Sequence, residues 1–270
     1  MTRAILLGTT GIATAFAMLA FGYLSGKPQS AIAGDTPQIM AQAAGMDRKE
    51  VEAIVRDYLL ENPEILIEMQ DVLEKRQKED QRVAQLETIR GAKDLIFNAA
   101  YDAVIGNPAG KVTIVEFYDY NCGYCKRAME DMQALVAKDP DLRFVLKEFP
   151  ILGPDSQKAH VVSQAFHKLM PEKSGEFHVR LLGSQGRAGE ASAIKLALEF
   201  GVDEAQLREA MKDPAITENF SQTYDLANKL HITGTPSYVV GNEVVFGALG
   251  PEVLTEKIAA ARACIADASC

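Results

Sequence analysis

Apolar positions recur at strand spacing in some parts of this 270-residue chain and at helix spacing in others. Short apolar runs bounded by turn residues predict four strands: 111–118, 142–149, 237–240 and 243–246. The last two flank a two-residue turn typical of a hairpin. Helical spacing covers most of 154–230 and returns at 251–263. This order of elements predicts an α/β domain over 105–270 with a helical insert at about 154–230.

A helical region precedes this domain over residues 47–104. After a first helix beginning near Asp47, Asn62 and Pro63 supply an N-cap and a first-turn proline for a second helix. If that helix continued to Tyr101 it would be roughly 58 Å long. This is more than a compact domain needs to cover its own sheet.

Two interpretations of residues 47–104 compete. One is a helical cap folded onto the α/β domain, and the other is an oligomerisation stalk. The stalk is favoured because Ile65, Met69 and Val72 form a short seam at four-three spacing. The polar stretch 74–82 is then solvated helix or a hinge, and the seam is too short to fix the number of strands.

The first 33 residues have the pattern of a secretory signal. Arg3 precedes a long apolar stretch, and Ala31-Ile-Ala33 fits a small-residue cleavage site. The apolar stretch 4–24 is also long enough to span a bilayer, so an uncleaved anchor is the alternative. Either interpretation places the body of the protein outside the cytoplasm. Residues 34–46 are small and polar without periodicity, which predicts a flexible linker.

Charge and cysteine content narrow the function classes. The formal net charge is -9, and removing residues 1–33 takes away two cations and no acids, leaving about -11. An acidic body does not suit a nucleic-acid partner. The four cysteines form two close pairs, which is too few for a disulfide-stapled scaffold of this size. The fold must therefore rest on its hydrophobic core.

The most informative motif is the dithiol Cys122-Gly123-Tyr124-Cys125, between a predicted strand and a helix-compatible segment over 126–136. A cysteine in the first turn of a helix is stabilised as the thiolate, the form that attacks disulfides. Cys122 is therefore the expected nucleophile and Cys125 the more buried resolving thiol. A structural zinc site is not favoured, because the four histidines are scattered singly: His160, His167, His178 and His231.

Two other positions near the dithiol carry open alternatives. Glu116 interrupts an apolar strand, either as a surface residue or as a buried acid that exchanges a proton with Cys125. The Thr235-Pro236 bond is either an ordinary turn before the hairpin or a cis bond that leaves backbone free to pair with an extended substrate. Lys147 and Glu148 also interrupt a strand, and they either pair with Glu116 or face solvent.

The second cysteine pair, Cys264 and Cys270, lies near the C-terminus. In an oxidising compartment a small structural disulfide is the favoured interpretation, although its short loop adds little stability. A second redox pair or a soft-metal site for Cu(I) is the alternative.

Three motifs together resemble the DsbA-like thioredoxin-fold family: residues 116–126 around the dithiol, Lys-Glu-Phe-Pro-Ile-Leu-Gly at 147–153, and Gly-Thr-Pro-Ser at 234–237. The similarity extends from about residue 105 to the end. The segment Asp57-Tyr-Leu-Leu-Glu-Asn-Pro-Glu64 further resembles the N-terminal domain of ScsC-type proteins (suppressor of copper sensitivity). Some of those oligomerise through this region, including as trimers.

The resemblance implies a thioredoxin fold with an inserted helical domain, Cys122 as the attacking cysteine and Cys125 as its partner. It also implies a cis Pro236 and a buried acid at Glu116. Strong oxidases of the family carry Pro-His between the cysteines, whereas Gly123 and Tyr124 match the DsbC-type isomerases, as does a threonine at 235. Without an imidazole beside it the Cys122 thiolate is less stable, so its disulfide is less oxidising.

These observations predict a periplasmic protein disulfide isomerase or reductase that uses no cofactor or metal. Its expected partners are disulfide-containing secreted proteins, a membrane redox partner and further copies of itself, with a trimer favoured. Gly123, Tyr124 and Thr235 are the expected substrate-binding positions. The alternatives are a monomeric DsbA-like dithiol oxidase and a Cu(I)-handling protein that uses the two thiols as soft ligands.

Overall fold

The computed structural model describes residues 47–267. Residues 47–69 fall in one compact unit and residues 70–267 in a second. The predicted signal over 1–33 and the predicted linker over 34–46 lie outside the described residues. Within the described part of the chain, no helix combines the length and the apolar character needed to cross a bilayer.

Helix α3 (Arg48–Glu61) begins where the helical pattern begins. The Asp47 carboxylate accepts the backbone N–H groups of Lys49 and Glu50, and the Glu50 side chain accepts the N–H of Asp47 in return. This capping box satisfies donors that the first turn would otherwise leave unpaired. Helix α4 (Ile65–Gly91) follows, two residues beyond the predicted Pro63 start.

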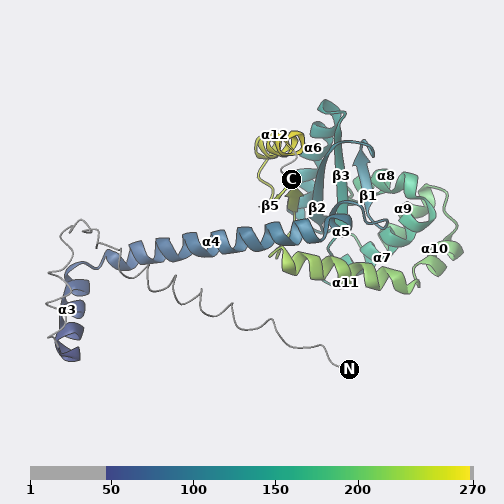
Figure 1. The fold of residues 1–270 in the computed structure, drawn as a ribbon. Coiled ribbons are helices and arrows are strands. Elements are labelled where there is room, and N and C mark those ends of the chain that lie inside the picture. The colour runs from purple at the N-terminus through teal and green to yellow at the C-terminus, as the bar shows by residue number, and fades with distance from the viewer. Residues whose placement is uncertain (1–46, 268–270) are drawn as a thin grey trace, which may run out of the picture. The chain divides into compact units, whose positions relative to one another are not determined.

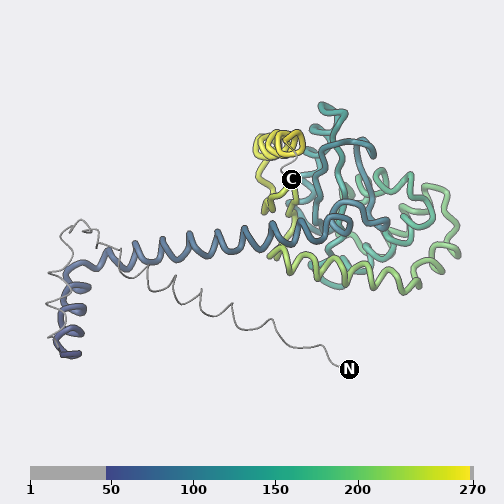
Figure 2. The backbone as a smooth tube through the Cα atoms, in the orientation of Figure 1, coloured from purple at the N-terminus to yellow at the C-terminus, as the bar shows by residue number. Residues whose placement is uncertain are grey.

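The remaining elements all belong to the second unit. In chain order they are α5 (Lys93–Phe97), β1 (Ala103–Gly106), β2 (Val112–Tyr118), α6 (Gly123–Lys138), β3 (Leu142–Glu148), α7 (Pro154–Leu169), the 3-10 helix η1 (Pro171–Lys173), α8 (Ser174–Leu182), α9 (Glu190–Glu199), α10 (Glu204–Ala210), α11 (Pro214–Lys229), β4 (Ser237–Val240), β5 (Glu243–Phe246) and α12 (Pro251–Ala266). The four predicted strands and the helical segment between β3 and β4 are confirmed. Figure 2 follows the path of that helical insert along the backbone.

The five strands form one sheet in the order β1-β3-β2-β4-β5. Strands β2 and β3 are parallel, whereas β1 with β3, β2 with β4 and β4 with β5 are antiparallel. Because β2 ends beside the start of β4, with Phe117 opposite Ser237, the segment after β2 and the segment before β4 meet at one edge of the sheet. The dithiol follows β2 and Pro236 precedes β4, so the topology brings them together.

Helices cover both faces of the sheet (Figure 1). One face packs against α6, α12 and the first helices of the insert through residues such as Ile114, Met132 and Ile258. The other face packs against the end of α4, α5 and α11 through residues such as Ile89 and Val115. This two-sided burial explains why β2 and β3 have almost continuous apolar sequences.

The N-terminal helical region differs from the expectation in two respects. The second helix does not run to Tyr101, because α4 ends at Gly91 and Ala92 leaves the helical conformation (φ -122°, ψ 26°) before α5. Glycine weakens a helix at this point, and the break lets Ile96 enter the core with no exposed surface. The polar stretch 74–82 is solvated helix within α4.

The packing also extends the α/β unit to residues before its expected start at residue 105. Ile89 and Ile96 are completely buried in the same cluster as Leu230. The Gln85 side-chain amide donates a hydrogen bond of 2.7 Å to the Leu230 carbonyl. The end of α4 and all of α5 therefore pack as part of the α/β unit, because their apolar side chains complete its core.

Candidate functional site

Cys122 is the N-cap residue of α6. Its backbone is extended (φ -79°, ψ 112°), and its Sγ atom accepts the backbone N–H of Cys125 at 3.3 Å. An N-cap side chain meets the unpaired N–H groups and the positive end of the helix dipole. The helix therefore begins three residues earlier than the sequence pattern suggested, and Cys122 caps it.

The loop before β4 completes the surroundings of this sulfur. The Thr235-Pro236 peptide bond is cis, and the Cys122 thiol donates a hydrogen bond to the Thr235 carbonyl oxygen at 3.2 Å. The Pro236 carbonyl accepts the N–H of Gly247, so the loop is anchored to the end of β5. Thr235 and Pro236 thus lie beside the dithiol, as the sequence suggested.

The two thiols have opposite acid strengths. Hydrogen bonding to the Cys125 side chain, with further contributions from Thr235 and the backbone N–H groups of Cys125 and Tyr124, lowers the pKa of Cys122 to about 6 despite its burial. Burial raises the pKa of Cys125, and the neighbouring Cys122 and Glu116 raise it further. Cys122 is therefore the thiolate near neutral pH, whereas Cys125 keeps its proton.

Glu116 is a buried acid rather than a surface residue. Only 1% of its surface is exposed, its Oε1 atom has no hydrogen-bond partner, and it pairs across the sheet with Tyr238. Burial, and after it the charge of Cys122, raises the pKa of Glu116 to about 8. A carboxyl group with this pKa can bind and release a proton near neutral pH.

The two residues between the cysteines face outward. Gly123 is exposed and a Cβ atom there would meet no other atom within 4 Å. The Tyr124 ring is 62% exposed, and the Arg127 guanidinium lies over it at 4.3 Å from the ring centroid. A polypeptide that approaches Cys122 can therefore contact Tyr124 directly.

The charged residues at the end of β3 neither pair with Glu116 nor face solvent. Lys147 has no exposed surface, its Nζ atom lies 2.5 Å from an Asp102 carboxylate oxygen, and it also donates to the Leu95 carbonyl. Glu148 accepts hydrogen bonds from His160 and Ser163 on α7. Each charged residue is thus compensated by a partner far away in the sequence.

Asp119 also belongs to the site, although the sequence pattern did not single it out. This carboxylate is fully buried and accepts the backbone N–H groups of Asn121 at 2.7 Å and Leu152 at 2.9 Å, and the Ser156 hydroxyl at 2.8 Å. It therefore ties the turn before Cys122 to the segment after β3. The available signal for Asp119 was its position: it follows an apolar strand directly and precedes an asparagine by two residues.

Cys264 lies in α12 and is disulfide-bonded. The predicted partner, Cys270, lies outside the described residues, so the pairing of these two cysteines stays a prediction. Cys122 and Cys125 are free thiols.

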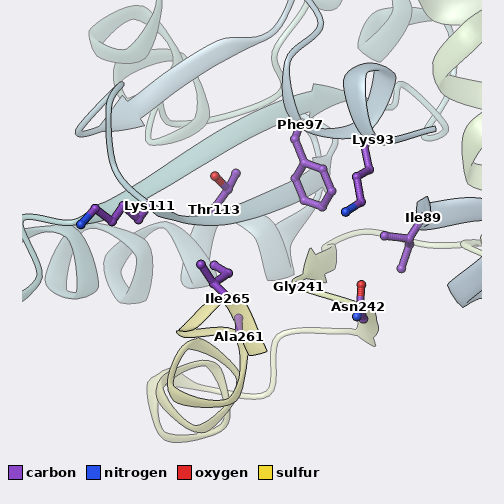
Figure 3. A pocket seen from close by; sticks show the side chains of 9 residues that line it. All are labelled: Ile89, Lys93, Phe97, Lys111, Thr113, Gly241, Asn242, Ala261 and Ile265. Carbon is purple, nitrogen blue, oxygen red and sulfur yellow. The ribbon is translucent and has the colours of Figure 1, made fainter. Parts of the chain in front are cut away.

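A separate pocket lies away from the dithiol (Figure 3). Lys111, Thr113, Gly241 and Asn242 are among the residues that line it. These residues stand at the beginning of β2 and at the hairpin turn, whereas Cys122 follows the other end of β2. The pocket therefore belongs to the opposite edge of the sheet. Across residues 47–267, no group of three or more His, Cys, Asp or Glu side chains is placed to hold a metal ion.

Two family models match the chain. The model described as "DSBA-like thioredoxin domain" matches residues 113–259. The model described as "Copper resistance protein ScsC N-terminal domain" matches residues 47–79. Together they confirm an α/β thioredoxin-like fold with a helical insert, preceded by an N-terminal helical region.

Solved structures agree with this assignment. A thioredoxin-like oxidoreductase from Silicibacter pomeroyi has a TM-score of 0.59 and 41% identity, and the match covers 63% of this chain and 96% of that one. A linker-deletion mutant of Proteus mirabilis ScsC has a TM-score of 0.62 and 27% identity, covering 81% and 98%. A periplasmic thioredoxin-like protein from Salmonella enterica serovar Typhimurium has a TM-score of 0.56 and 26% identity, covering 62% and 95%.

Curated relatives match over shorter stretches. The thiol:disulfide interchange protein DsbA of Bordetella parapertussis is 27% identical over 137 residues, which are 49% of this chain and 64% of that protein. The Na(+)/H(+) antiporter NhaA 3 of Salinispora tropica is 26% identical over 164 residues, which are 59% of this chain and 24% of the antiporter. The chain thus spans about a quarter of the antiporter and less than two thirds of the DsbA protein.

Proposed function

This chain belongs to the DSBA-like thioredoxin domain family of thiol–disulfide oxidoreductases, and from this premise we propose that it is a periplasmic protein disulfide isomerase or reductase. The observation that carries the proposal is the position of Cys122. Its sulfur caps α6 and lies 3.2 Å from the carbonyl before the cis proline. A thiolate therefore stands beside backbone that can pair with an extended polypeptide.

The proposed reaction begins when the Cys122 thiolate attacks one sulfur of a client disulfide. A bond forms between Cys122 Sγ and that sulfur, and the other client sulfur leaves as a thiolate. In isomerisation, a client thiolate later attacks the mixed disulfide, makes a new client disulfide and restores the Cys122 thiolate. No net oxidation or reduction occurs in that cycle.

Reduction of the client uses Cys125 instead. Its thiol transfers a proton to the Glu116 carboxylate, and the resulting thiolate attacks Cys122 Sγ. The client leaves with both of its sulfurs reduced, and the disulfide between Cys122 and Cys125 carries the oxidation. Glu116 suits this role because its pKa of about 8 permits proton uptake and release near neutral pH.

The dipeptide between the cysteines favours isomerase or reductase activity over strong oxidation. Neither Gly123 nor Tyr124 can donate a charged hydrogen bond to the Cys122 thiolate, and Arg127 lies over the Tyr124 ring. The thiolate is stabilised by the side chains of Cys125 and Thr235 and by the backbone N–H groups of Cys125 and Tyr124. A moderately stabilised thiolate gives a disulfide of moderate oxidising strength.

We propose that copies of the chain assemble through the N-terminal helices. The match to the ScsC N-terminal domain suggests oligomerisation. Helix α3 has no buried residue, and several large apolar side chains of α3 and the first turns of α4 are more than 40% exposed: Val51, Ile54, Val55, Tyr58, Leu60, Leu66, Ile67, Met69, Val72 and Leu73. Exposed apolar residues on each of these helices mark an interaction surface. We place copies of the same chain on it, with a trimer favoured.

Recovery of activity from a disulfide-scrambled model enzyme tests the proposed function. The full chain with reduced thiols should restore the enzyme catalytically, and Cys122→Ser should not. Rapid oxidation of a reduced peptide by the disulfide form, with no recovery of the scrambled enzyme, would instead indicate a dithiol oxidase. We also propose that its clients are secreted, disulfide-containing proteins and that it has a redox partner in the membrane.

A further inference from the structure

The turn that carries Cys122 is held by a buried polar network on α7. The peptide group between Asp119 and Tyr120 makes two hydrogen bonds. Its N–H group donates to His160 Nε2 at 3.2 Å, and its carbonyl accepts the N–H of Cys122 at 3.0 Å. A peptide group is planar and rigid. Fixing its N–H group therefore also fixes the carbonyl that holds the backbone of Cys122.

The hydrogen bond from Tyr120 determines the tautomer of His160. A backbone N–H group can only donate, so His160 Nε2 must be the unprotonated, accepting nitrogen. The proton then lies on Nδ1, which is 3.0 Å from a Glu148 carboxylate oxygen. Glu148 thus selects the ring tautomer that can hold the Asp119–Tyr120 peptide group.

The same carboxylate holds the Tyr120 side chain. The Ser163 hydroxyl donates to the other Glu148 oxygen at 2.6 Å and is 2.8 Å from the Tyr120 hydroxyl. Because the Ser163 proton is engaged with Glu148, the Tyr120 hydroxyl donates to Ser163. Tyr120 is therefore tied to Glu148 at both its backbone and its ring.

Because this network is buried, each of its polar groups needs a hydrogen-bond partner within the protein. His160 and Tyr120 have no exposed surface, and Glu148 is 6% exposed. The rings of Tyr118, Tyr120 and Phe220 lie against the His160 ring, and both tyrosines belong to the hydrogen-bonded chain that ends at Glu148. His178 packs against the two tyrosines. A polar group that loses its partner here cannot turn to water instead. The network therefore imposes one geometry on the turn.

We propose that His160, oriented by Glu148, is a positioning residue that fixes the Asp119–Tyr120 peptide group and thereby holds the Cys122 sulfur in its N-cap position. His160 does not touch the reacting sulfur. It acts through one peptide group, whose displacement would weaken the hydrogen bond from Cys125 N–H to Cys122 Sγ. The proposal rests on the proposed function for its catalytic meaning, although thiolate formation itself is measured without any client.

The test is the titration of the Cys122 thiolate in the reduced full chain, followed by ultraviolet absorbance. His160→Phe keeps an aromatic ring but removes the acceptor, so the acid dissociation constant of Cys122 should fall roughly three- to tenfold, the effect of one hydrogen bond. His160→Gln provides an acceptor oxygen and should recover most of the loss. The control His167→Phe changes a histidine of the same helix that bonds Ala100 and Ser174, and it should titrate like the unsubstituted chain.

If His160→Phe does not fold, a second measurement still tests the positioning role of His160. Nitrogen-15 shifts of the histidine rings in the unsubstituted chain should show His160 protonated on Nδ1 alone. Protonation on Nε2 would overturn the proposal, and so would equal thiolate titrations of a folded His160→Phe chain and the unsubstituted chain. Equal losses in the Phe and Gln variants would assign His160 a packing role and overturn it as well. A failure to restore scrambled clients would count against the proposed function only.

Discussion

The Cys122 sulfur lies 3.2 Å from the carbonyl oxygen of Thr235, across an edge of the sheet where two segments 113 residues apart in sequence meet. One segment supplies the nucleophile and the other supplies the backbone next to the cis proline. A client strand that pairs with this backbone would present its disulfide to the thiolate. In the proposed function, client binding at this backbone would place the client disulfide beside the attacking sulfur.

Removing the resolving thiol should trap clients. In Cys125→Ser the Cys122 thiolate still attacks, but Cys125 no longer displaces the client, so the mixed disulfides that no client thiolate resolves should accumulate. Non-reducing electrophoresis of the variant with a scrambled client measures this product. Cys122→Ser is the matched variant and should form none. Equal trapping by both variants would contradict the assignment of the nucleophile.

The reactivity of Cys122 should depend on pH through its lowered pKa. Alkylation of the reduced chain should rise through about pH 6, whereas in the unfolded chain it should follow the ordinary thiol pKa of 9.0. Because the folded pKa is the lower one, this thiol stabilises the reduced fold fully above about pH 9, and the contribution is lost as the pH falls towards 6. Alkylation rates from pH 4 to pH 10 would check the midpoint. A midpoint near 9 in the folded chain would contradict the site geometry.

Replacing Glu116 with glutamine should stabilise the reduced protein at alkaline pH. Its pKa is raised from 4.5 to about 8, so ionising Glu116 requires more free energy in the folded state than in the unfolded state. The two chains should have similar stability near pH 4, and Glu116→Gln should be more stable by on the order of 4 kcal/mol at pH 8. Urea unfolding at the two pH values measures the difference. The exposed control Glu130→Gln should show little change with pH.

Thr235→Val should make Cys122 a weaker acid. Valine has nearly the shape of threonine but lacks the hydroxyl group that contributes to stabilising the thiolate. We expect a roughly twofold to tenfold smaller acid dissociation constant, measured from alkylation rates, with the fold intact. Thr255→Val on α12 removes an exposed hydroxyl that bonds the Pro251 carbonyl, and it should leave the titration unchanged. An unchanged titration in Thr235→Val would show that the Thr235 hydroxyl does not stabilise the thiolate.

Local patterns predicted most of the secondary structure. The apolar runs of β2 and β3 and the hairpin β4-β5 have strand periodicity within a few residues, and turn residues bound them. Strand β1 was missed, because its four residues Ala103–Gly106 carry too little pattern and are fixed by pairing with β3 about 40 residues later. Edge pairing of this kind depends on the assembled sheet rather than on local sequence.

Prediction of the site succeeded where chemistry was concentrated in a motif. The spacing of Cys122 and Cys125 identifies the dithiol motif. The structure brings Pro236 and Glu116 to the same sheet edge. The buried partners of Lys147 and Glu148 could not be foreseen, because they come from other elements of the fold. Neither could the break of the long helix at Gly91, which depends on the burial of Ile96.

In the proposed function, the N-terminal seam assembles several Cys122 sites into an isomerase. Met69→Glu combined with Val72→Glu places charge on exposed apolar positions of α4, and Gln70→Glu combined with Gln77→Glu adds the same charge on a different face of the helix. Light scattering and recovery of the disulfide-scrambled enzyme would be measured on both full-length variants. We predict that only the seam variant becomes monomeric and loses isomerase activity while keeping its Cys122 titration. A monomeric seam variant with undiminished recovery would contradict the claim.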